Sequence, residues 1–376
     1  MRLGSNRESA SLRVDLPANA RRRRPDHQVV TPPLPASGAP VFSILTSVYR
    51  TEAYFPETIE SVRAQTLEDW ELIVVDNGMS DEVVRIVEKY SDDPRIRLVR
   101  QENRGLGGGI DAAAAVARGR YYAVLDSDDL LMPTFCERTA AILDARPEID
   151  VVGIDAYLFE DEDGLDQIRS YRQSVGISTP ADLEHPIGLV EMIGGNVLYY
   201  TAGIRAEAWA KGGGYSCDTP KVEDLAMFLR MIAAGCDVRC LPERLARYRL
   251  RADSFSRDPA QVDAFETSLE RAFLNAQSLT DAPEVQDALD HSLRKLRFDQ
   301  AMRRARTALI ESDIPTARRQ ARRAFEQRRS VRPAVVYVGL VLAPGVLRNV
   351  HPAKQWLSGT LATLTRRGRA LLRPST

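Results

Sequence analysis

Three carboxylates lie within four positions of one another at Asp126, Asp128 and Asp129, directly after the apolar run 121–125. This run predicts a buried strand, and like charges crowded at the end of a strand repel one another unless a cation or solvent relieves them. Open α/β sheets bind ligands at the carboxyl ends of their strands. Carboxylate oxygens suit Mg²⁺ or Mn²⁺, which bind through one or two carboxylates together with substrate phosphates. The cluster therefore predicts a metal site and a substrate that carries a diphosphate.

A solvated acidic turn is the alternative interpretation of the same residues, because Asp and Ser favour turns. Taken alone, the cluster fits a ligand set and a turn equally well. The apolar strand that precedes it, and the usual position of ligands in α/β sheets, favour the metal site.

The composition is that of an ordinary globular protein, with 376 residues, 44% of them hydrophobic and 27% charged, which is enough for two or three domains. Four cysteines show no CxxC spacing, so they indicate neither a disulfide framework nor a zinc site; they are Cys136, Cys217, Cys236 and Cys240. We expect these thiols to be buried or idle in a reducing compartment.

The net charge of −1 conceals two basic ends. Residues 1–38 contain Arg21–Arg24, and residues 331–376 contain seven Arg or Lys and no Asp or Glu. A nucleic-acid binder concentrates positive charge on its folded domain, so we expect no nucleic-acid partner. Residues 1–38 lack the apolar core of a secretory signal and predict a disordered basic segment. The chain is therefore expected in the cytoplasm, either free or peripheral at the inner face of the cell membrane, where basic arms contact anionic lipid.

From residue 41 onward, short apolar runs alternate with amphipathic segments, which is the pattern of βαβ units and a largely parallel sheet. Residues 103–109 are expected to form a loop and residues 160–187 an irregular segment. The expected strands are 41–49, 70–78, 96–101, 121–125, 149–159 and 197–200, and the expected helices are 55–65, 81–90, 110–118, 134–146 and 222–234.

The last third of the chain is expected to be helical. Residues 263–330 have helical periodicity, and the turn at Ser312-Asp313 resembles a single tetratricopeptide hairpin. The apolar stretch 334–343 is too short to span a bilayer. Beyond it, a basic amphipathic pattern fits either a helix on a membrane surface or packing against the preceding helices. We expect four regions: a basic segment 1–38, an α/β domain 39–260, a helical region 261–330 and a basic amphipathic tail 331–376.

Five segments, in order and spacing, resemble the family 2 glycosyltransferases of the GT-A fold over roughly residues 41–258. The first strand ends in Ser47-Val48-Tyr49, like the family's opening nucleotide loop, and the family's next helix, strand and base-recognition loop resemble SVRAQTLEDWELIVVDNGMSDE. The approach to the family's metal motif resembles NRGLGGG and ARGRYYAVLDSDDLLMP. The helix that holds its catalytic base resembles VEDLAMFLRMIAAG, and the segment that closes its site resembles ARYRLRADSFS.

This resemblance implies an α/β fold with a GT-A type nucleotide-diphosphate-sugar-binding domain, a mainly parallel sheet and a helical C-terminal region. It implies an inverting, metal-dependent transfer of sugar to a hydroxyl of a glycan or lipid-linked acceptor, in the synthesis of surface polysaccharide, glycolipid or cell-wall glycan. The implied residues are Asp128 and Asp129 for Mn²⁺ or Mg²⁺, Asp224 and then Glu223 for the catalytic base, and Ser47, Tyr49, Asp76, Asn77, Arg104, Asp126 and Arg251 for the donor.

Sugar transfer needs the same parts on chemical grounds. A departing nucleotide diphosphate develops negative charge that a metal neutralises as a Lewis acid. The acceptor hydroxyl needs a base, and a carboxylate can serve if its surroundings tune its pKa. Asp224 follows Glu223 at the start of an apolar helix, where acidic residues also act as helix caps. Both roles can hold at once.

Five positions depart from the family's pattern: Arg50 replaces an Asn, Asn77 a second Asp, Ile110-Asp111 an Arg-Asn pair, and Arg251 a His. A guanidinium at position 251 can pair with phosphate but cannot ligate a metal. The departures at positions 50, 110, 111 and 251 keep a second hypothesis open, a catalytically silent GT-A module that binds sugar nucleotide or glycan as a scaffold. A metal-dependent nucleotidyltransferase is a weaker third hypothesis, because the first strand lacks a glycine-rich, basic phosphate loop.

Overall fold

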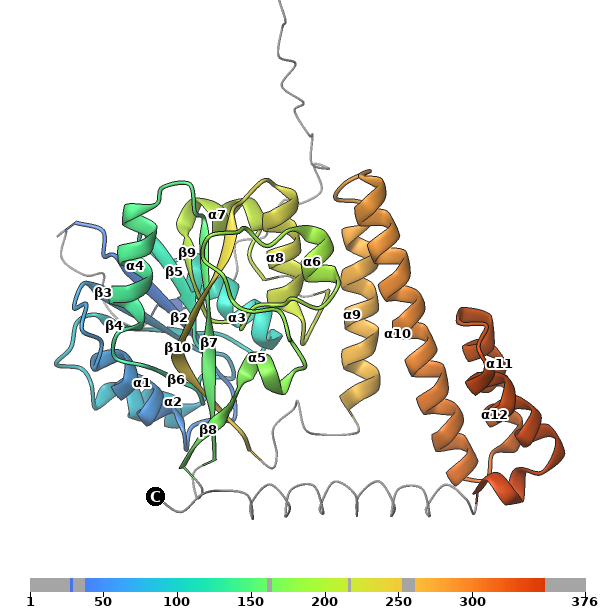
Figure 1. Cartoon of the computed structure of the whole chain (residues 1–376). Coiled ribbons are helices and arrows are strands. Elements are labelled where there is room, and N and C mark those ends of the chain that lie inside the picture. Colours follow the sequence, from blue (N-terminus) through green and yellow to red (C-terminus); the bar gives the residue numbers. More distant parts are fainter. Residues whose placement is uncertain (1–27, 30–37, 161–163, 216–217, 252–260, 349–376) are drawn as a thin grey trace, which may run out of the picture.

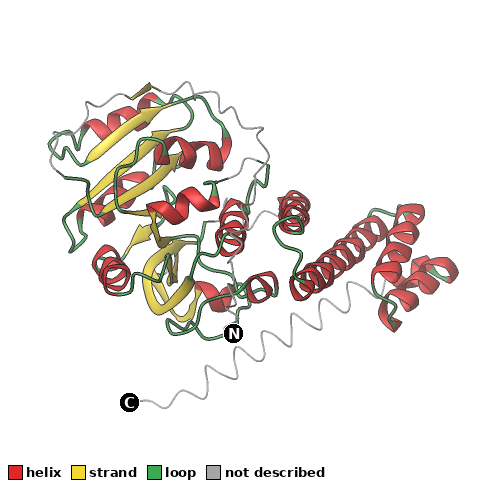
Figure 2. Ribbon diagram, turned by 90° about the horizontal axis from the view of Figure 1, so that it is seen from above, coloured by secondary structure: helices red, strands yellow, loops and turns green. Residues whose placement is uncertain are grey.

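The computed structural model describes residues 28–29, 38–160, 164–215, 218–251 and 261–348. A mixed β-sheet forms the centre of the α/β domain, helices cover it, and a group of C-terminal helices projects to one side (Figures 1 and 2). The expected α/β class with a helical C-terminal region is therefore confirmed. The expected N-terminal segment 1–38 and the end of the tail, residues 349–376, lie largely outside the described residues.

In the described part of the chain, the sheet has ten strands, in the order β1-β4-β3-β2-β5-β9-β7-β10-β6 with β8 on β7. Neighbours run parallel from β4 to β5 and between β7 and β10, and the remaining pairs are antiparallel. The strands are β1 Gln28–Val29, β2 Phe42–Val48, β3 Trp70–Asp76, β4 Ile96–Arg100, β5 Tyr121–Val124, β6 Leu130–Leu131, β7 Val151–Glu160, β8 Gly164–Ser170, β9 Ala202–Arg205 and β10 Val238–Arg249.

The central strands β2 and β3 are buried along their whole lengths. Strands covered on both faces read as near-continuous apolar runs, and this is why the sequence located them. In register, Val48 of β2 lies beside Asp76 of β3, and Asp76 lies beside Arg100 of β4. The parallel strands therefore bring the polar residues at their carboxyl ends to one edge of the sheet.

Helices connect the strands and then form the C-terminal region. Helix α9 packs against α8, α10 packs against α6 and α9, and the far end of α10 carries α11 and α12 (Figure 1). No helix in the described part of the chain is long and apolar enough to cross a membrane. The helices are α1 Phe55–Arg63, α2 Asp81–Glu88, α3 Gly105–Ala114, α4 Phe135–Ala145, α5 Tyr171–Ser174, α6 Leu189–Ile193, α7 Ala206–Gly212, α8 Glu223–Ala233, α9 Val262–Ala276, α10 Pro283–Ile310, α11 Ile314–Gln327 and α12 Val331–Leu342.

The glycine-rich segment 103–109, expected as a loop, contains the first turns of α3. Glycine is a poor helix former, but tertiary contacts override its propensity here. The buried amide of Asn77 donates a hydrogen bond to Gly105 O at 2.8 Å and accepts one from the Arg104 N–H at 3.1 Å. These bonds fix the start of α3, so the helix begins earlier than the expected residue 110.

Four further elements differ from expectation. The strand expected at 197–200 lies later in the chain, at β9, and the segment expected to be irregular contains β8 and α5. The long strand β10 was not expected at all. Its sequence contains Pro242, and its pairing with β7 shifts register between Cys240 and Ala246, so a regular alternation is absent from the sequence.

Helix α3 lies close against β2 because Gly109 has no side chain. A Cβ at this position would lie 2.1 Å from Ser47 Oγ and 2.7 Å from Ser47 Cβ. Only glycine fits this contact without a shift of the helix.

We expect Gly109→Ala to lower the free energy of unfolding by about 1–3 kcal/mol, because the added methyl group pushes α3 away from β2. Urea unfolding followed by circular dichroism measures the difference. Gly345→Ala is the control, since a Cβ there meets no atom within 4 Å. Equal unfolding free energies for Gly109→Ala and wild type would contradict the close packing.

Candidate active site

Asp129 lies at the centre of a buried hydrogen-bond network. Its carboxylate accepts hydrogen bonds from the Tyr199 hydroxyl at 2.9 Å, the Tyr200 hydroxyl at 2.7 Å and the Arg249 backbone N–H at 2.8 Å. Burial and the neighbouring charge of Asp128 nevertheless raise the pKa of Asp129 to about 7. Asp129 thus fastens the acidic loop 126–129 to two distant segments of the chain.

Asp126 carries the charge that the structure leaves least compensated. Its Oδ1 atom is buried and has no hydrogen-bond partner among the described residues. Burial raises the pKa of Asp126 well above its usual range, and the charges of Asp129, Asp128, Asp224 and Glu223 raise it further. A buried carboxylate oxygen with acidic neighbours and no donor is a position where a cation is favoured.

The donor set of the loop fits a hard divalent ion. Among the described residues, no three His, Cys, Asp or Glu side chains are placed to hold a metal ion together. Mg²⁺ and Mn²⁺ sites with one or two protein carboxylates take their remaining ligands from water and substrate phosphates. Asp126 and Asp128 would supply such a pair, so the fit requires a diphosphate in the same site.

Two arginines at the end of β10 face the acidic loop. The guanidinium of Arg251 donates to Asp128 Oδ2 at 2.8 Å. The guanidinium of Arg249 donates to Asp128 O at 2.7 Å and to Glu57 at 2.9 Å, and it lies over the rings of Tyr54 and Phe159. The structure therefore pairs Arg251, which was expected to bind the donor, with Asp128, which was expected to bind the metal.

The start of α8 brings the two expected base residues to the same site. Glu223 is buried, which raises its pKa to about 7, although the backbone N–H groups of Lys221, Gly107 and Glu223 itself partly offset the effect. Burial also raises the pKa of Asp224. Both carboxylates raise the pKa of Asp126, so they lie within electrostatic reach of the loop. Because Glu223 accepts from Gly107 in the first turn of α3, it also joins α8 to α3.

The residues expected at the nucleotide lie at the carboxyl edge of β2 and β3. Ser47 is buried, and its carbonyl accepts a hydrogen bond from Ser127 Oγ at 3.0 Å, which ties β2 to the acidic loop. Tyr49 and Arg104 are exposed. Asp76 is buried and accepts from Arg100 Nε at 2.8 Å and from the Ser80 N–H at 2.9 Å. Asp76 and Asn77 thus hold the surrounding loops through their hydrogen bonds.

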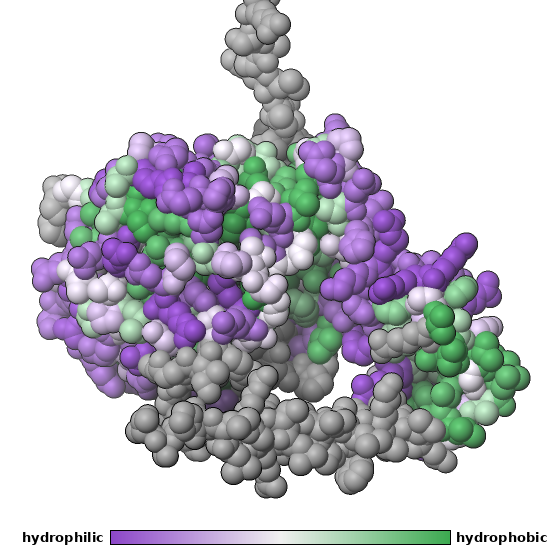
Figure 3. Space-filling view, viewed as in Figure 1, coloured by the Kyte–Doolittle hydropathy of each residue, from purple (hydrophilic) through white to green (hydrophobic). Residues whose placement is uncertain are grey.

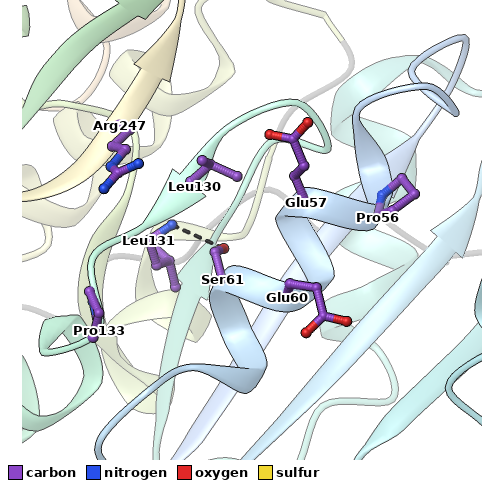
Figure 4. Close-up of a pocket in the computed structure, with 8 residues that line it drawn as sticks. All are labelled: Pro56, Glu57, Glu60, Ser61, Leu130, Leu131, Pro133 and Arg247. Atoms are coloured by element: carbon purple, nitrogen blue, oxygen red, sulfur yellow. Dashed lines mark hydrogen bonds between the residues drawn. The ribbon is translucent and has the colours of Figure 1, made fainter. Parts of the chain in front are cut away.

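A surface pocket of about 390 Å³ opens between α1, β6 and β10 (Figure 4). In this pocket the Leu131 N–H donates to Ser61 Oγ at 3.2 Å. None of the acidic loop residues lines it, but one of its lining residues, Glu57, accepts a hydrogen bond from Arg249 of the candidate active site. Its lining residues are Pro56, Glu57, Glu60, Ser61, Leu130, Leu131, Pro133 and Arg247.

The sequence did not single out Tyr199, Tyr200 or Arg249, which hold the loop in place. The alternation of Arg247, Arg249 and Arg251 has the period of a strand and could have indicated Arg249. The tyrosines carry no such signal, because their approach to Asp129 depends on the path of the chain between β8 and β9.

Comparison with known proteins shows a family likeness over part of the α/β domain. Residues 43–203 match the model of Glycosyl transferase family 2. Over these residues the chain is similar to the family 2 glycosyltransferases. The match includes β2 to β9 and the acidic loop, but it ends before α8 and β10.

Three relatives are similar to this chain. EpsH of Bacillus subtilis, named as a glycosyltransferase, is 39% identical over 125 residues, which are 33% of this chain and 36% of EpsH. EpsE of the same organism, also named as a glycosyltransferase, is 28% identical over 247 residues, 64% of this chain and 83% of EpsE. Chondroitin synthase of Escherichia coli is 37% identical over 99 residues, 26% of this chain and 14% of the synthase. The chain thus spans only a minor part of EpsH and of the synthase.

Two solved structures resemble this fold. S. aureus TarS 1–349 in complex with UDP-GlcNAc has a TM-score of 0.57 at 18% identity, covering 76% of this chain and 81% of TarS 1–349. The mannosyltransferase PcManGT from Pyrobaculum calidifontis, in complex with GDP-Man and Mn²⁺, has a TM-score of 0.52 at 16% identity. The match covers 89% of this chain and 88% of the PcManGT chain. At these sequence identities the comparison shows a similar fold.

We expect Tyr200→Phe to destabilise the protein by about 1–3 kcal/mol, because buried polar groups lose a partner. The Tyr200 hydroxyl donates to Asp129 and accepts from the Asp126 N–H at 3.1 Å, so both ends of the loop depend on it. Chemical denaturation measures the loss. The matched control is Tyr122→Phe, whose hydroxyl lies 3.5 Å from its acceptor, Ala117 O. If both variants were as stable as wild type, Tyr200 would not hold the loop.

The raised pKa of Glu223 predicts a pH-dependent stability. Between its ordinary value of 4.5 and about 7, the folded state holds the proton that the unfolded state releases, so stability falls as pH rises through this window. We expect Glu223→Gln to remove up to about 3 kcal/mol of the difference in unfolding free energy between pH 4.5 and pH 8. Urea titrations at the two pH values measure it, and an unchanged difference in Glu223→Gln would contradict the assigned pKa.

Proposed function

We propose that the chain is an inverting, metal-dependent glycosyltransferase that moves a sugar from a nucleotide-diphosphate donor to a hydroxyl of a glycan or lipid-linked acceptor. The observation that carries the proposal is that two sets of carboxylates lie within electrostatic reach of each other, Asp126 and Asp128 in the loop after β5 and Glu223 and Asp224 at the start of α8. The first set suits the leaving group and the second suits the attacking hydroxyl. The domain family supports transfer of a sugar in particular.

On the donor side, the buried oxygen of Asp126 and the carboxylate of Asp128 suit Mn²⁺ or Mg²⁺ bound together with a diphosphate. These two residues would hold the ion, which would supply Lewis-acid stabilisation of the charge on the leaving diphosphate. Arg251 supplies a second positive charge, and its planar guanidinium can hold a phosphate through two hydrogen bonds. The complexes of TarS with UDP-GlcNAc and of PcManGT with GDP-Man and Mn²⁺ support this class of donor and cofactor.

On the acceptor side, Asp224 is the proposed base. Its burial raises its pKa, which strengthens it as a proton acceptor. The acceptor oxygen forms a bond to the anomeric carbon as the bond to the diphosphate breaks, and the hydroxyl proton passes to Asp224. A single displacement of this kind inverts the anomeric configuration. Glu223 is occupied by backbone N–H groups and is the second choice.

The name of one relative, chondroitin synthase, supports a role in the assembly of a polysaccharide. We therefore place the reaction in the synthesis of surface polysaccharide, glycolipid or cell-wall glycan. The glycan chain or lipid-linked sugar that grows in such a process is the proposed acceptor.

One observation favours the alternative of a silent scaffold. The guanidinium of Arg251 already neutralises Asp128, at 2.8 Å, so the carboxylate has a cation of its own. A module that keeps this pair closed would bind a nucleotide or glycan without transferring a sugar. Turnover of the donor separates the two functions.

We expect Asp224→Asn to lower turnover by about 10²- to 10⁴-fold, because the amide keeps the size of the side chain but cannot accept the proton. Donor binding should change little, since Asp224 is assigned to the acceptor. The assay is transfer or hydrolysis over a panel of nucleotide sugars with Mn²⁺, and donor binding is measured by calorimetry.

Asp81→Asn is the matched control, because Asp81 also lies in the first turn of a helix but is exposed on α2. It should retain wild-type turnover. Full activity of Asp224→Asn would move the base elsewhere. A wild-type chain that turns over none of these donors would favour the scaffold.

A further inference from the structure

Helix α12 has apolar residues on two opposite faces. On one face, Val336 and Leu340 pack in a small cluster with residues of α10 and α11, including Leu309 and Ala317. The other face is open to solvent. Its residues follow one another at intervals of four, three and four, which places them on one stripe: Val331, Val335, Val338 and Leu342, exposed by 78, 60, 51 and 77%.

Hydrophobic surface gathers at this end of the molecule, over α11 and α12 (Figure 3). Val341 and Val346 extend the patch, with 44 and 62% of their surface exposed. Contiguous apolar surface of this kind marks an interaction site more often than scattered exposed residues do. We call the six residues of the stripe and its extension the α12 patch.

The segment that contains the α12 patch is strongly basic. Residues 314–348 contain eight arginines and one acidic residue, Glu326, a net charge of +7. One arginine is structural, because the guanidinium of Arg318 donates to Leu340 O at 2.9 Å and to Val341 O at 3.2 Å, which fastens α12 to α11. Arg322 pairs with Glu326 at 3.1 Å, but Arg319 and Arg323 are also exposed, so the excess of positive charge remains at the surface.

We propose that α11 and α12 bind the surface of an anionic membrane, with the α12 patch in the boundary between headgroups and acyl chains and the arginines among the headgroups. An apolar stripe beside a basic face is the pattern of helices that lie in the membrane interface. Arginine suits the edge of such a surface because its aliphatic stem packs on apolar groups while its charge stays in water. Anionic lipids attract the basic face.

The geometry of α12 agrees with binding in the plane of the membrane. The helix has 12 residues, and a helix needs about 20 apolar residues to cross the hydrocarbon core. The α12 patch lies at the far end of α10, away from the α/β domain, so a membrane can reach it without contact with the candidate active site (Figure 1). The inference therefore does not depend on the proposed reaction.

A second copy of this chain is the other occupant that an apolar face suggests, but the charge opposes it. Two copies joined through the α12 patch would bring two regions of net charge +7 together, whereas an anionic membrane has the opposite sign. Charge complementarity thus favours the lipid surface.

The test is co-sedimentation of the full chain with vesicles of phosphatidylcholine alone or mixed with phosphatidylglycerol. Wild type should bind the mixed vesicles only, and added salt should weaken the binding because it screens the arginines. Replacing three residues of the patch together, Val335→Ser, Val338→Ser and Leu342→Ser, should weaken binding at least about tenfold, since apolar burial is lost. The variant should fold normally because these side chains are exposed.

Two further variants sharpen the test. The matched control replaces exposed apolar residues elsewhere, Val175→Ser, Phe265→Ser and Leu274→Ser, and should bind like wild type. Replacing the α11 charges, Arg319→Gln, Arg322→Gln and Arg323→Gln, should weaken binding and reduce its dependence on salt.

Three results would overturn the proposal. Wild type could fail to bind mixed vesicles, or the patch variant could bind them as tightly as wild type, in which case another part of the chain, including residues 349–376, makes the contact. Light scattering could instead show a wild-type dimer that the patch variant converts to a monomer while vesicle binding is unchanged. The α12 patch would then be an interface between copies.

Discussion

Negative charge crowded at the carboxyl edge of the sheet is the constraint on which the rest of the site depends. Burial raises the pKa of Asp126, Asp129 and Glu223, and the mutual repulsion of the carboxylates adds to the effect. A fold that only needed stability would not place these groups together. Strongly perturbed carboxylates in one place are typical of a functional site, where the charge is balanced when a ligand arrives.

The structure holds the acidic loop through groups from distant parts of the chain. The hydroxyls of Tyr199 and Tyr200 and the backbone N–H of Arg249 bind Asp129, and Arg251 binds Asp128. These partners come from the segment before β9 and from the end of β10, 70 or more residues away in sequence from the loop. The position of the loop therefore depends on the completed fold, and the α/β domain must form as a whole before the site exists.

The sequence was sufficient where local pattern and tertiary environment agree. The buried strands β2 and β3 are near-continuous apolar runs, and the acidic loop and the acidic start of α8 stand out by residue type and order. The sequence was insufficient where tertiary contacts determine the local structure. Helix α3 begins among glycines because the Asn77 amide and the Glu223 carboxylate hold its first turn.

The same reason explains the missed partners of the loop. The strand β10 was hidden by its proline and its shift in register, so Arg249 could not be placed opposite Asp128. Asp129 was expected to be a metal ligand from its type and position alone. Its burial and its three hydrogen bonds add a structural role that the sequence does not indicate.

We propose that the carboxylate cluster binds a divalent ion and a nucleoside diphosphate together. Calorimetric titration of UDP and GDP, with and without Mn²⁺, measures this directly. Because Asp126 and Asp128 provide too few ligands for the ion alone, each ligand should strengthen the binding of the other, and by the same factor. We expect Mn²⁺ to tighten binding of at least one of the two nucleotides by about tenfold or more, with an equal effect of that nucleotide on Mn²⁺. Equal affinities for both nucleotides with and without Mn²⁺ would contradict it.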